Sequence, residues 1–127
     1  MNKVSNNHTC IRINADENQI QACKVQLQSI DSKIEKVARI LNLAGNGTRL
    51  KILFLLRQER ELCPCDLSDI LEMSVPAISQ HLRKLRDTDM IKRRKVGQTI
   101  FYSLDRENKI LESVLESVID TEKMLVL

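Results

Sequence analysis

The sequence has few of the residues that form aromatic cores and tight turns. Aromatic residues make up 2% of its 127 residues, and the chain has three glycines and two prolines. A β-sandwich needs many glycine- and proline-rich turns, so this composition favours helices packed through leucine, isoleucine and valine. No apolar run approaches the about 20 residues of a membrane span, and the polar start MNKVSNNHT is unlike a signal peptide. We therefore expect a cytoplasmic protein with one core and no membrane partner.

Signatures of catalysis are also missing. The sequence has two histidines, no glycine-rich phosphate loop, no HExxH motif and no Ser/His/Asp ordering of the kind a nucleophilic triad requires. We therefore expect a protein that is not an enzyme.

Four cysteines stand out in this helical chain. In a reducing compartment they are expected to be metal ligands or redox thiols rather than disulfides. Cys63 and Cys65 flank Pro64, which forces Cys63 into an extended conformation just before a helix, so that both sulfurs can converge. A helix N-terminus stabilises the thiolate form that binds metal. The alternative is that both are small buried hydrophobic residues.

Two thiolates are too few for a closed metal site, so the N-terminal cysteines are candidates to complete it. Cys10 lies in a polar arm beside His8, where a hydrophobic residue would have little to pack against. Cys23 lies on an apolar helical seam, so burial in a core or interface competes with ligation. The predicted metal ligands are Cys63, Cys65, Cys10 and Cys23.

Positive charge is concentrated in one part of the chain. Residues 75–104 carry seven basic and two acidic side chains, a net charge of +5, whereas the remaining residues carry a net charge of −2. This distribution is typical of a surface that binds a polyanion.

The same region predicts a helix-turn-helix followed by a hairpin. Pro64 suits the first turn of a helix over 64–72, and Ser74 caps a second helix that starts near Val75 after a tight turn. Two strands follow around Gly97, the first of them strongly basic. The predicted inward residues are Leu67, Ile70 and Leu71 in the first helix and Val75, Ile78, Leu82 and Leu85 in the second. A helix-turn-helix with a basic hairpin is a winged helix, so the fold class is mainly α with a small β-hairpin.

The N-terminal part predicts an arm and a helical seam. Residues 1–14 are polar, and a capping box at Asn14 or Asp16 begins a helix whose apolar residues recur at steps of three and four. This apolar seam consists of Ile20, Cys23, Leu27, Ile30, Ile34, Val37 and Leu41. A second capping box at Ser32 predicts a break near Asp31. We therefore divide the chain into an arm and first helix, 1–31, and a winged-helix DNA-binding and dimerisation domain, 32–127.

Further helices are expected on both sides of the helix-turn-helix. Thr48 is expected to cap a helix that ends near Gln58. A last apolar stripe includes Leu111, Leu115 and Val118. The apolar seam and this stripe favour a homodimer.

The solvent side of the second helix of the helix-turn-helix carries residues suited to double-stranded DNA. Gln80 suits an adenine edge and Arg83 a guanine edge, whereas Ser79 and Lys84 suit bases or phosphates. His81 is a phosphate contact or a partly buried structural residue. The predicted DNA-binding residues are Ser74, Ala77, Ser79, Gln80, His81, Arg83, Lys84, Lys92, Arg93, Arg94, Lys95 and Gln98.

From about Ile34 to Ile119 the chain resembles the ArsR/SmtB family of bacterial metal-sensing repressors. ELCPCDLSDIL is similar to the family's ELCxCDL metal box, and SVPAISQHLRKLRDTDMIKRRKVGQTIFYSL is similar to its recognition helix and wing. The resemblance implies a homodimer paired through its first and last helices. It also implies binding of operator DNA without metal and release when metal binds.

Departures from the family pattern bear on the metal. Arsenite sensors often carry a third cysteine where this chain has Ser68, and zinc sensors often use histidine on the last helix, which has none here. The chain is closest to the cadmium- and lead-responsive branch, in which arm cysteines complete the thiol pair. Cys10 matches one of them, Asn14 stands at the other, and Cys23 is a possible replacement. Three thiolates suit Pb, As, Bi or Hg, and four suit Cd or Zn.

Three functions are consistent with these features of the sequence. The first is a transcriptional repressor whose effector is a soft divalent or trivalent metal ion, with Cd or Pb favoured over Zn, Hg, As and Bi. The second is a thiol-redox-sensing regulator on the same winged-helix scaffold. The third, a small redox enzyme or metal carrier, leaves the basic segment unexplained.

Overall fold

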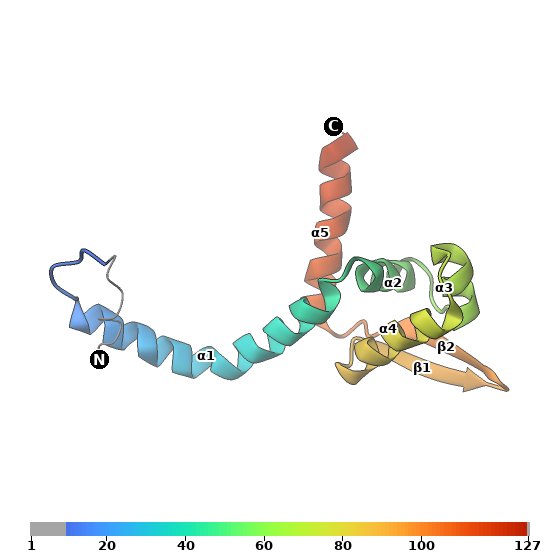
Figure 1. Cartoon of the computed structure of the whole chain (residues 1–127), viewed down its shortest axis with the longest axis horizontal. Coiled ribbons are helices and arrows are strands. Elements are labelled where there is room, and N and C mark those ends of the chain that lie inside the picture. The colour runs from blue at the N-terminus through green and yellow to red at the C-terminus, as the bar shows by residue number, and fades with distance from the viewer. Residues whose placement is uncertain (1–9, 127) are drawn as a thin grey trace. The chain divides into compact units, whose positions relative to one another are not determined.

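The computed structural model describes the backbone of residues 10–126 and the side chains of residues 10–120 (Figure 1). Residues 1–9 of the predicted polar arm lie outside the described residues. The chain divides into two compact units, Met1–Ile34 and Glu35–Leu127. The elements are α1 (Glu17–Ala44), α2 (Gly47–Gln58), α3 (Pro64–Leu71), α4 (Val75–Asp87), β1 (Ile91–Val96), β2 (Thr99–Leu104) and α5 (Lys109–Val126).

Helix α1 begins at one of the two caps predicted for it. Asp16 accepts a hydrogen bond from the backbone of Gln19 at 3.0 Å, with its carboxylate satisfying a free N–H of the first turn. The predicted break near Asp31 is wrong, because α1 runs without interruption to Ala44. The stretch contains no glycine or proline, and its apolar residues keep helical spacing throughout, so nothing in it opposes a continuous helix.

The second unit contains the hydrophobic core. Residues of α2, α3, α4, α5 and the hairpin pack together with the end of α1, and the largest fully buried side chains are leucines, isoleucines and one methionine. Burial of this kind removes about 1.5–3 kcal/mol of unfavourable hydration per large side chain. The core consists of Ile40, Ala44, Ile52, Leu53, Leu56, Leu67, Ile78, Leu82, Leu85, Met90, Ile91, Tyr102, Leu104, Leu111 and Leu115.

Most predicted inward residues are confirmed, and two are wrong. Leu67, Ile78, Leu82 and Leu85 have no exposed surface, but Ile70 is 50% exposed and Val75 is 38% exposed. Both of these lie at helix positions that turn away from the core, Val75 at the first residue of α4 and Ile70 near the end of α3.

The connection between α1 and α2 requires glycine at position 45, and its N-cap residue differs from the predicted one. The side chain of Asn46, not that of Thr48, accepts the hydrogen bond from Arg49 that caps α2. The Gly45 N–H donates to the carbonyl of Leu41 at 2.8 Å. A β-carbon at Gly45 would lie 2.8 Å from that backbone oxygen, so only glycine fits this close approach.

The two strands form the predicted hairpin. They are antiparallel, and their register pairs Ile91 with Leu104 and Val96 with Thr99. Gly97 in the turn has φ +62°, a left-handed conformation that favours glycine. Leu62 forms an isolated antiparallel bridge with Tyr102: its N–H donates to the Tyr102 carbonyl at 3.1 Å, and its carbonyl accepts from the Tyr102 N–H at 2.9 Å.

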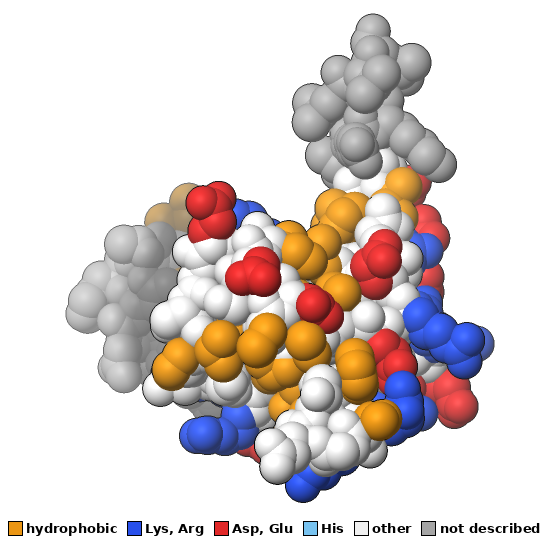
Figure 2. All heavy atoms as spheres, turned by 90° about the vertical axis from the view of Figure 1, so that its right-hand side faces the viewer, with side chains coloured by type: hydrophobic (Ala, Val, Ile, Leu, Met, Phe, Trp, Pro, Cys, Tyr) orange, Lys and Arg blue, Asp and Glu red, His pale blue; other side chains and the backbone are white. Residues whose placement is uncertain are grey.

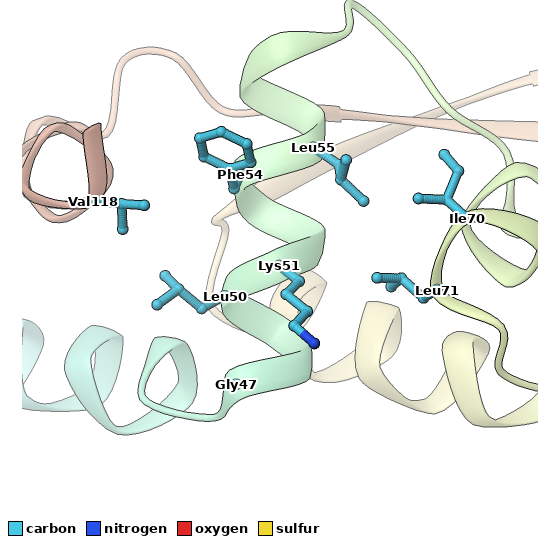
Figure 3. A pocket seen from close by; sticks show the side chains of 8 residues that line it. All are labelled: Gly47, Leu50, Lys51, Phe54, Leu55, Ile70, Leu71 and Val118. Carbon is cyan, nitrogen blue, oxygen red and sulfur yellow. The ribbon is translucent and has the colours of Figure 1, made fainter. Parts of the chain in front are cut away.

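An apolar groove of about 400 Å³ lies among α2, α3 and α5 (Figure 3). Its lining residues are Gly47, Leu50, Lys51, Phe54, Leu55, Ile70, Leu71 and Val118. Among the described residues, no helix has the length and hydropathy needed to span a membrane.

Candidate DNA-binding surface and thiol site

The N-terminus of α3 holds the Cys63–Pro64–Cys65 motif in a reciprocal cap. Cys63 is extended, with φ −92° and ψ 166°, as predicted from Pro64. Its sulfur accepts a hydrogen bond from the backbone of Asp66 at 3.4 Å, and the Asp66 carboxylate accepts one from the backbone of Cys63 at 3.0 Å. These bonds to Cys63 lower the pKa of Asp66. The capping role of Asp66 was missed, although its spacing from Cys63 is that of a capping box.

Both thiols of the motif are available for ligation. Cys63 is half-buried and Cys65 is exposed, and both are free, as are Cys10 and Cys23. The thiol pair at the start of a helix fits a soft metal ion, because the helix N-terminus favours the thiolate form. Within residues 10–120, no three Cys, His, Asp or Glu side chains gather into a cluster that could hold a metal ion. Cys10 and Cys23 are exposed residues of the first unit.

The turn between α3 and α4 is tied by Ser68. Its hydroxyl donates to the carbonyl of Met73, and its own carbonyl accepts from the Met73 N–H at 3.2 Å. Glu72 ends α3 in the left-handed region, with φ 54°. Ser68 stands where arsenite sensors often carry a third cysteine, and in this chain it stabilises the turn of the helix-turn-helix.

The segment before Cys63 connects the thiol motif to the hairpin. Leu62 pairs with Tyr102 through its backbone, and Glu61 forms a bidentate ion pair with Arg94, with N–O distances of 2.9 and 2.7 Å. Arg94 lowers the pKa of Glu61 by this hydrogen bonding and by its charge. Sequence reasoning missed this pair, because 33 residues separate the two side chains.

Helix α4 presents a polar face opposite its buried stripe. The Ser74 hydroxyl accepts a hydrogen bond from the Ala77 N–H at 3.3 Å, which confirms the predicted cap. Among the residues predicted to contact DNA, the side chains of Gln80, Arg83 and Lys84 are exposed. Those of Ala77, Ser79 and His81 are half-buried.

His81 makes a contact inside the protein. The Nδ1 atom of its ring lies 3.3 Å from a guanidinium nitrogen of Arg49. Another nitrogen of Arg49 donates to the carbonyl of Leu43 at 2.7 Å, so this arginine links α2 to the end of α1 and to α4. Burial lowers the pKa of His81, and the charges of Arg49 and Lys84 lower it further. A neutral His81 accepting a hydrogen bond from Arg49 fits this arrangement.

The lowered pKa of His81 predicts a loss of stability in mild acid. The unfolded state, with a histidine pKa near 6.5, binds the proton more readily than the folded state does. Stability from this residue is therefore fully present above about pH 6.5 and falls as the pH drops toward the folded pKa. Thermal unfolding between about pH 7.5 and about pH 5 should show a smaller loss for His81→Gln than for the wild type. Equal losses in both proteins would contradict a lowered pKa of His81 in the folded state.

The basic residues of the hairpin differ in their partners. Arg94 is paired with Glu61, and Lys92 lies 3.9 Å from Asp105. Arg93 and Lys95 form no ion pair among residues 10–120, and all four basic residues of β1, like Gln98 in the turn, are exposed.

Comparison with known proteins identifies the family. Residues 46–93 match the model of the bacterial regulatory protein, arsR family. An uncharacterized HTH-type transcriptional regulator of Methanocaldococcus jannaschii, MJ1325, is 40% identical over 86 residues, which are 66% of this chain and 97% of that protein. The chain belongs to the ArsR family.

Further relatives of this ArsR-family chain are named for metal or metalloid resistance. A homolog of the cadmium resistance transcriptional regulatory protein CadC from Staphylococcus aureus is 42% identical over 57% of this chain. The arsenic resistance transcriptional regulator ArsR1 of Pseudomonas putida is 33% identical over 66% of it. The chain spans 60% of the length of the first and 66% of the second.

Solved structures support the same fold. Reduced HlyU from Vibrio cholerae is 35% identical with a TM-score of 0.64, over 72% of this chain and 94% of that one. HlyU from Vibrio vulnificus is 29% identical with a TM-score of 0.65, over 76% and 97%. The winged helix-turn-helix predicted from the sequence is therefore confirmed. The curated relatives named here are transcriptional regulators, and they give no support to a small redox enzyme or metal carrier.

Proposed function

We propose that this ArsR-family regulator is a metal-responsive repressor. It binds operator DNA as a homodimer in the cytoplasm, and a soft metal ion bound by cysteine thiolates releases it. Cys63 and Cys65 supply two ligands, Cys10 supplies a third, and Cys23 completes a site with four thiolates. Cd and Pb are the preferred ions, with Zn, Hg, As and Bi as further candidates.

One observation carries this proposal. The thiol motif begins the first helix of the helix-turn-helix, and the two residues before it bond to the hairpin, through Leu62–Tyr102 and Glu61–Arg94. Ligation of Cys63 and Cys65 therefore acts on the segment that joins both DNA-binding elements. A ligand shifts such an equilibrium only if it binds one arrangement more tightly than the other. An ion that also binds Cys10 favours an arrangement in which the metal connects the N-terminal arm to the start of α3.

The proposed DNA contacts follow from exposure. Gln80 and Arg83 are the base readers of α4, because both are exposed and suit adenine and guanine edges. Ser79 on α4 is half-buried and suits bases or phosphates, and Ser74, which caps the start of α4, suits a phosphate. Lys84 of α4 and Gln98 of the hairpin turn are also exposed and belong to this surface.

The dimer is supported by apolar surface that one chain leaves uncovered. Leu27, Ile30, Ile34 and Leu41 of α1 are each at least 42% exposed. Apolar side chains also gather on the face of the second unit shown in Figure 2. Leu111 and Leu115, which were predicted to lie in the interface, are buried in the chain's own core and leave Val118 as the half-buried part of that stripe. Exposed apolar surface of this extent is typical of an interface.

A titration of the reduced full chain tests the proposed function. A duplex that the protein selects from a randomised pool serves as the operator, and fluorescence anisotropy measures its affinity. Affinity should fall steeply with salt, and CdCl₂ should release the duplex while sulfur-to-metal absorption in the ultraviolet rises. Release by peroxide, with no tight uptake of Cd(II) or Pb(II), would instead favour the redox-sensing regulator. Absence of salt-dependent duplex binding would contradict both.

A further inference from the structure

The four consecutive basic residues of β1 are divided between two faces of the hairpin. Successive side chains of a strand point to opposite faces, and residues paired across an antiparallel ladder share a face. Arg93 is opposite Tyr102 and Lys95 is opposite Ile100, whereas Lys92 is opposite Ser103 and Arg94 is opposite Phe101. Arg93 and Lys95 therefore lie on one face, and Lys92 and Arg94 lie on the other.

The first of these faces is the one on which the helices pack. Tyr102 and Leu104 are buried in the core, and Ile91, which is opposite Leu104, is buried with them. Helix α4 contacts β1, and α2 and α3 contact β2. Arg93 and Lys95 continue this face beyond the core toward the hairpin turn, where both are exposed. We call it the helix-side face.

The second face carries acidic partners for its basic residues. Leu62 pairs with Tyr102 on the helix-side face, so Glu61 is directed to the opposite face, where it meets Arg94. The Arg94 guanidinium also lies 5.6 Å from the centre of the Phe101 ring. Asp105 lies 3.9 Å from Lys92. We call it the acid-paired face.

No such partners exist on the helix-side face in the part of the chain that the structure describes. Neither Arg93 nor Lys95 forms an ion pair among residues 10–120. A cation without an internal partner has its full charge available for a phosphate. An exposed ion pair alone is too weak to keep Arg94 from exchanging Glu61 for a phosphate. The alternation of side chains along β1 is the stronger constraint, because it directs Arg94 to the acid-paired face and away from the helix-side face on which α4 packs.

We infer that Arg93 and Lys95 are the residues of the hairpin that contact DNA phosphates, whereas Arg94 is a positioning residue that Glu61 holds. This inference rests on the proposed DNA binding and narrows the predicted set, which includes all four residues 92–95. The Glu61–Arg94 pair, together with the two Leu62–Tyr102 backbone hydrogen bonds, connects the hairpin to the segment that carries Cys63. The pair therefore links the thiol motif to the angle at which Arg93 and Lys95 meet the duplex.

The salt dependence of DNA binding separates the two roles. The full chain, without metal, is titrated with a short duplex of fixed sequence at several salt concentrations, and the slope of log affinity against log salt measures how many phosphates the protein neutralises. Arg93→Gln and Lys95→Gln should each lower the magnitude of this slope by about 0.9 for every phosphate that is no longer neutralised. Arg94→Gln removes the same charge from the same strand and should leave the slope unchanged. Circular dichroism checks that each variant is folded. Arg93→Gln and Lys95→Gln test the helix-side face separately, so the loss of fold in one of them leaves the other as a test.

A charge exchange tests the positioning role. Glu61→Arg places two cations together and should weaken binding to the selected operator, and Glu61→Arg combined with Arg94→Glu should restore it by re-forming the pair. An Arg94→Gln slope that falls as far as that of Arg93→Gln would overturn the inference while DNA binding stands. Failure of the exchanged pair to restore affinity would overturn the positioning role. A wild-type chain with no salt-dependent binding would overturn the proposed function and this inference with it.

Discussion

Replacing Cys63 by serine should leave operator binding intact and abolish release by Cd(II) or Pb(II). Serine is a good N-cap residue, so its hydroxyl can take over the hydrogen bond that the Cys63 sulfur accepts from Asp66. The variant therefore keeps the start of α3 and loses only the thiolate. Cys65→Ser should behave in the same way, because Cys65 is exposed and holds no cap.

The size of the effect follows from the coupling between the two ligands. Binding of metal and DNA to one protein is reciprocal, and couplings of about 1–3 kcal/mol change affinity about 5- to 150-fold. Wild-type protein should lose operator affinity by a factor in this range when saturated with Cd(II), and Cys63→Ser should lose none. Fluorescence anisotropy with and without metal measures both. Release of Cys63→Ser at the same metal concentration as wild type would place the site elsewhere.

The N-terminal cysteines give graded controls for this experiment. Cys10→Ser should weaken release at least partly, because it removes the third proposed ligand. Cys23→Ser should matter only for a site with four thiolates, and then more for Cd(II) than for Pb(II). Metal affinity should also decrease as the pH falls, because protons compete for the thiolates.

The winged helix could be predicted from the sequence because its signals are local. Pro64 and Ser74 mark the starts of α3 and α4 by the geometry of single residues, and Gly97 marks the hairpin turn by its left-handed conformation. Helical spacing then identified Ile78 and Leu82 as buried. These features depend on neighbours a few residues away, which a sequence displays directly.

The features that the sequence did not predict depend on long-range contacts, on competition between local signals or on the register of the hairpin. The Glu61–Arg94 and Arg49–His81 contacts join residues 33 and 32 positions apart, and no spacing rule relates them. Ser32 has the residue types of a capping box, but a cap forms only where the helix must start, and α1 continues through it. The division of residues 92–95 between two faces required the register of the hairpin, which fixes the face of every side chain.

Replacing Leu41 by aspartate should convert the protein from a dimer to a monomer. Leu41 lies on the apolar seam of α1 and is 50% exposed, so a dimer formed through this seam would bury the new carboxylate. An unpaired charge in an apolar interface costs several kcal/mol, enough to separate the two copies. Light scattering should then give a mass near 14.6 kDa in place of about twice that value.

The matched control is Val25→Asp in the same helix. Val25 is 54% exposed but lies off the seam, so this variant adds the same charge and should remain a dimer. Operator affinity should fall for Leu41→Asp alone, by a factor on the order of 10²–10⁴, because two linked recognition helices bind far more tightly than one. Full occupancy of the operator by a monomeric Leu41→Asp protein at the wild-type concentration would show that each chain reads DNA by itself. The metal switch would then act within one subunit, where ligation of Cys63 and Cys65 at the start of α3 would have to change the surface of α4.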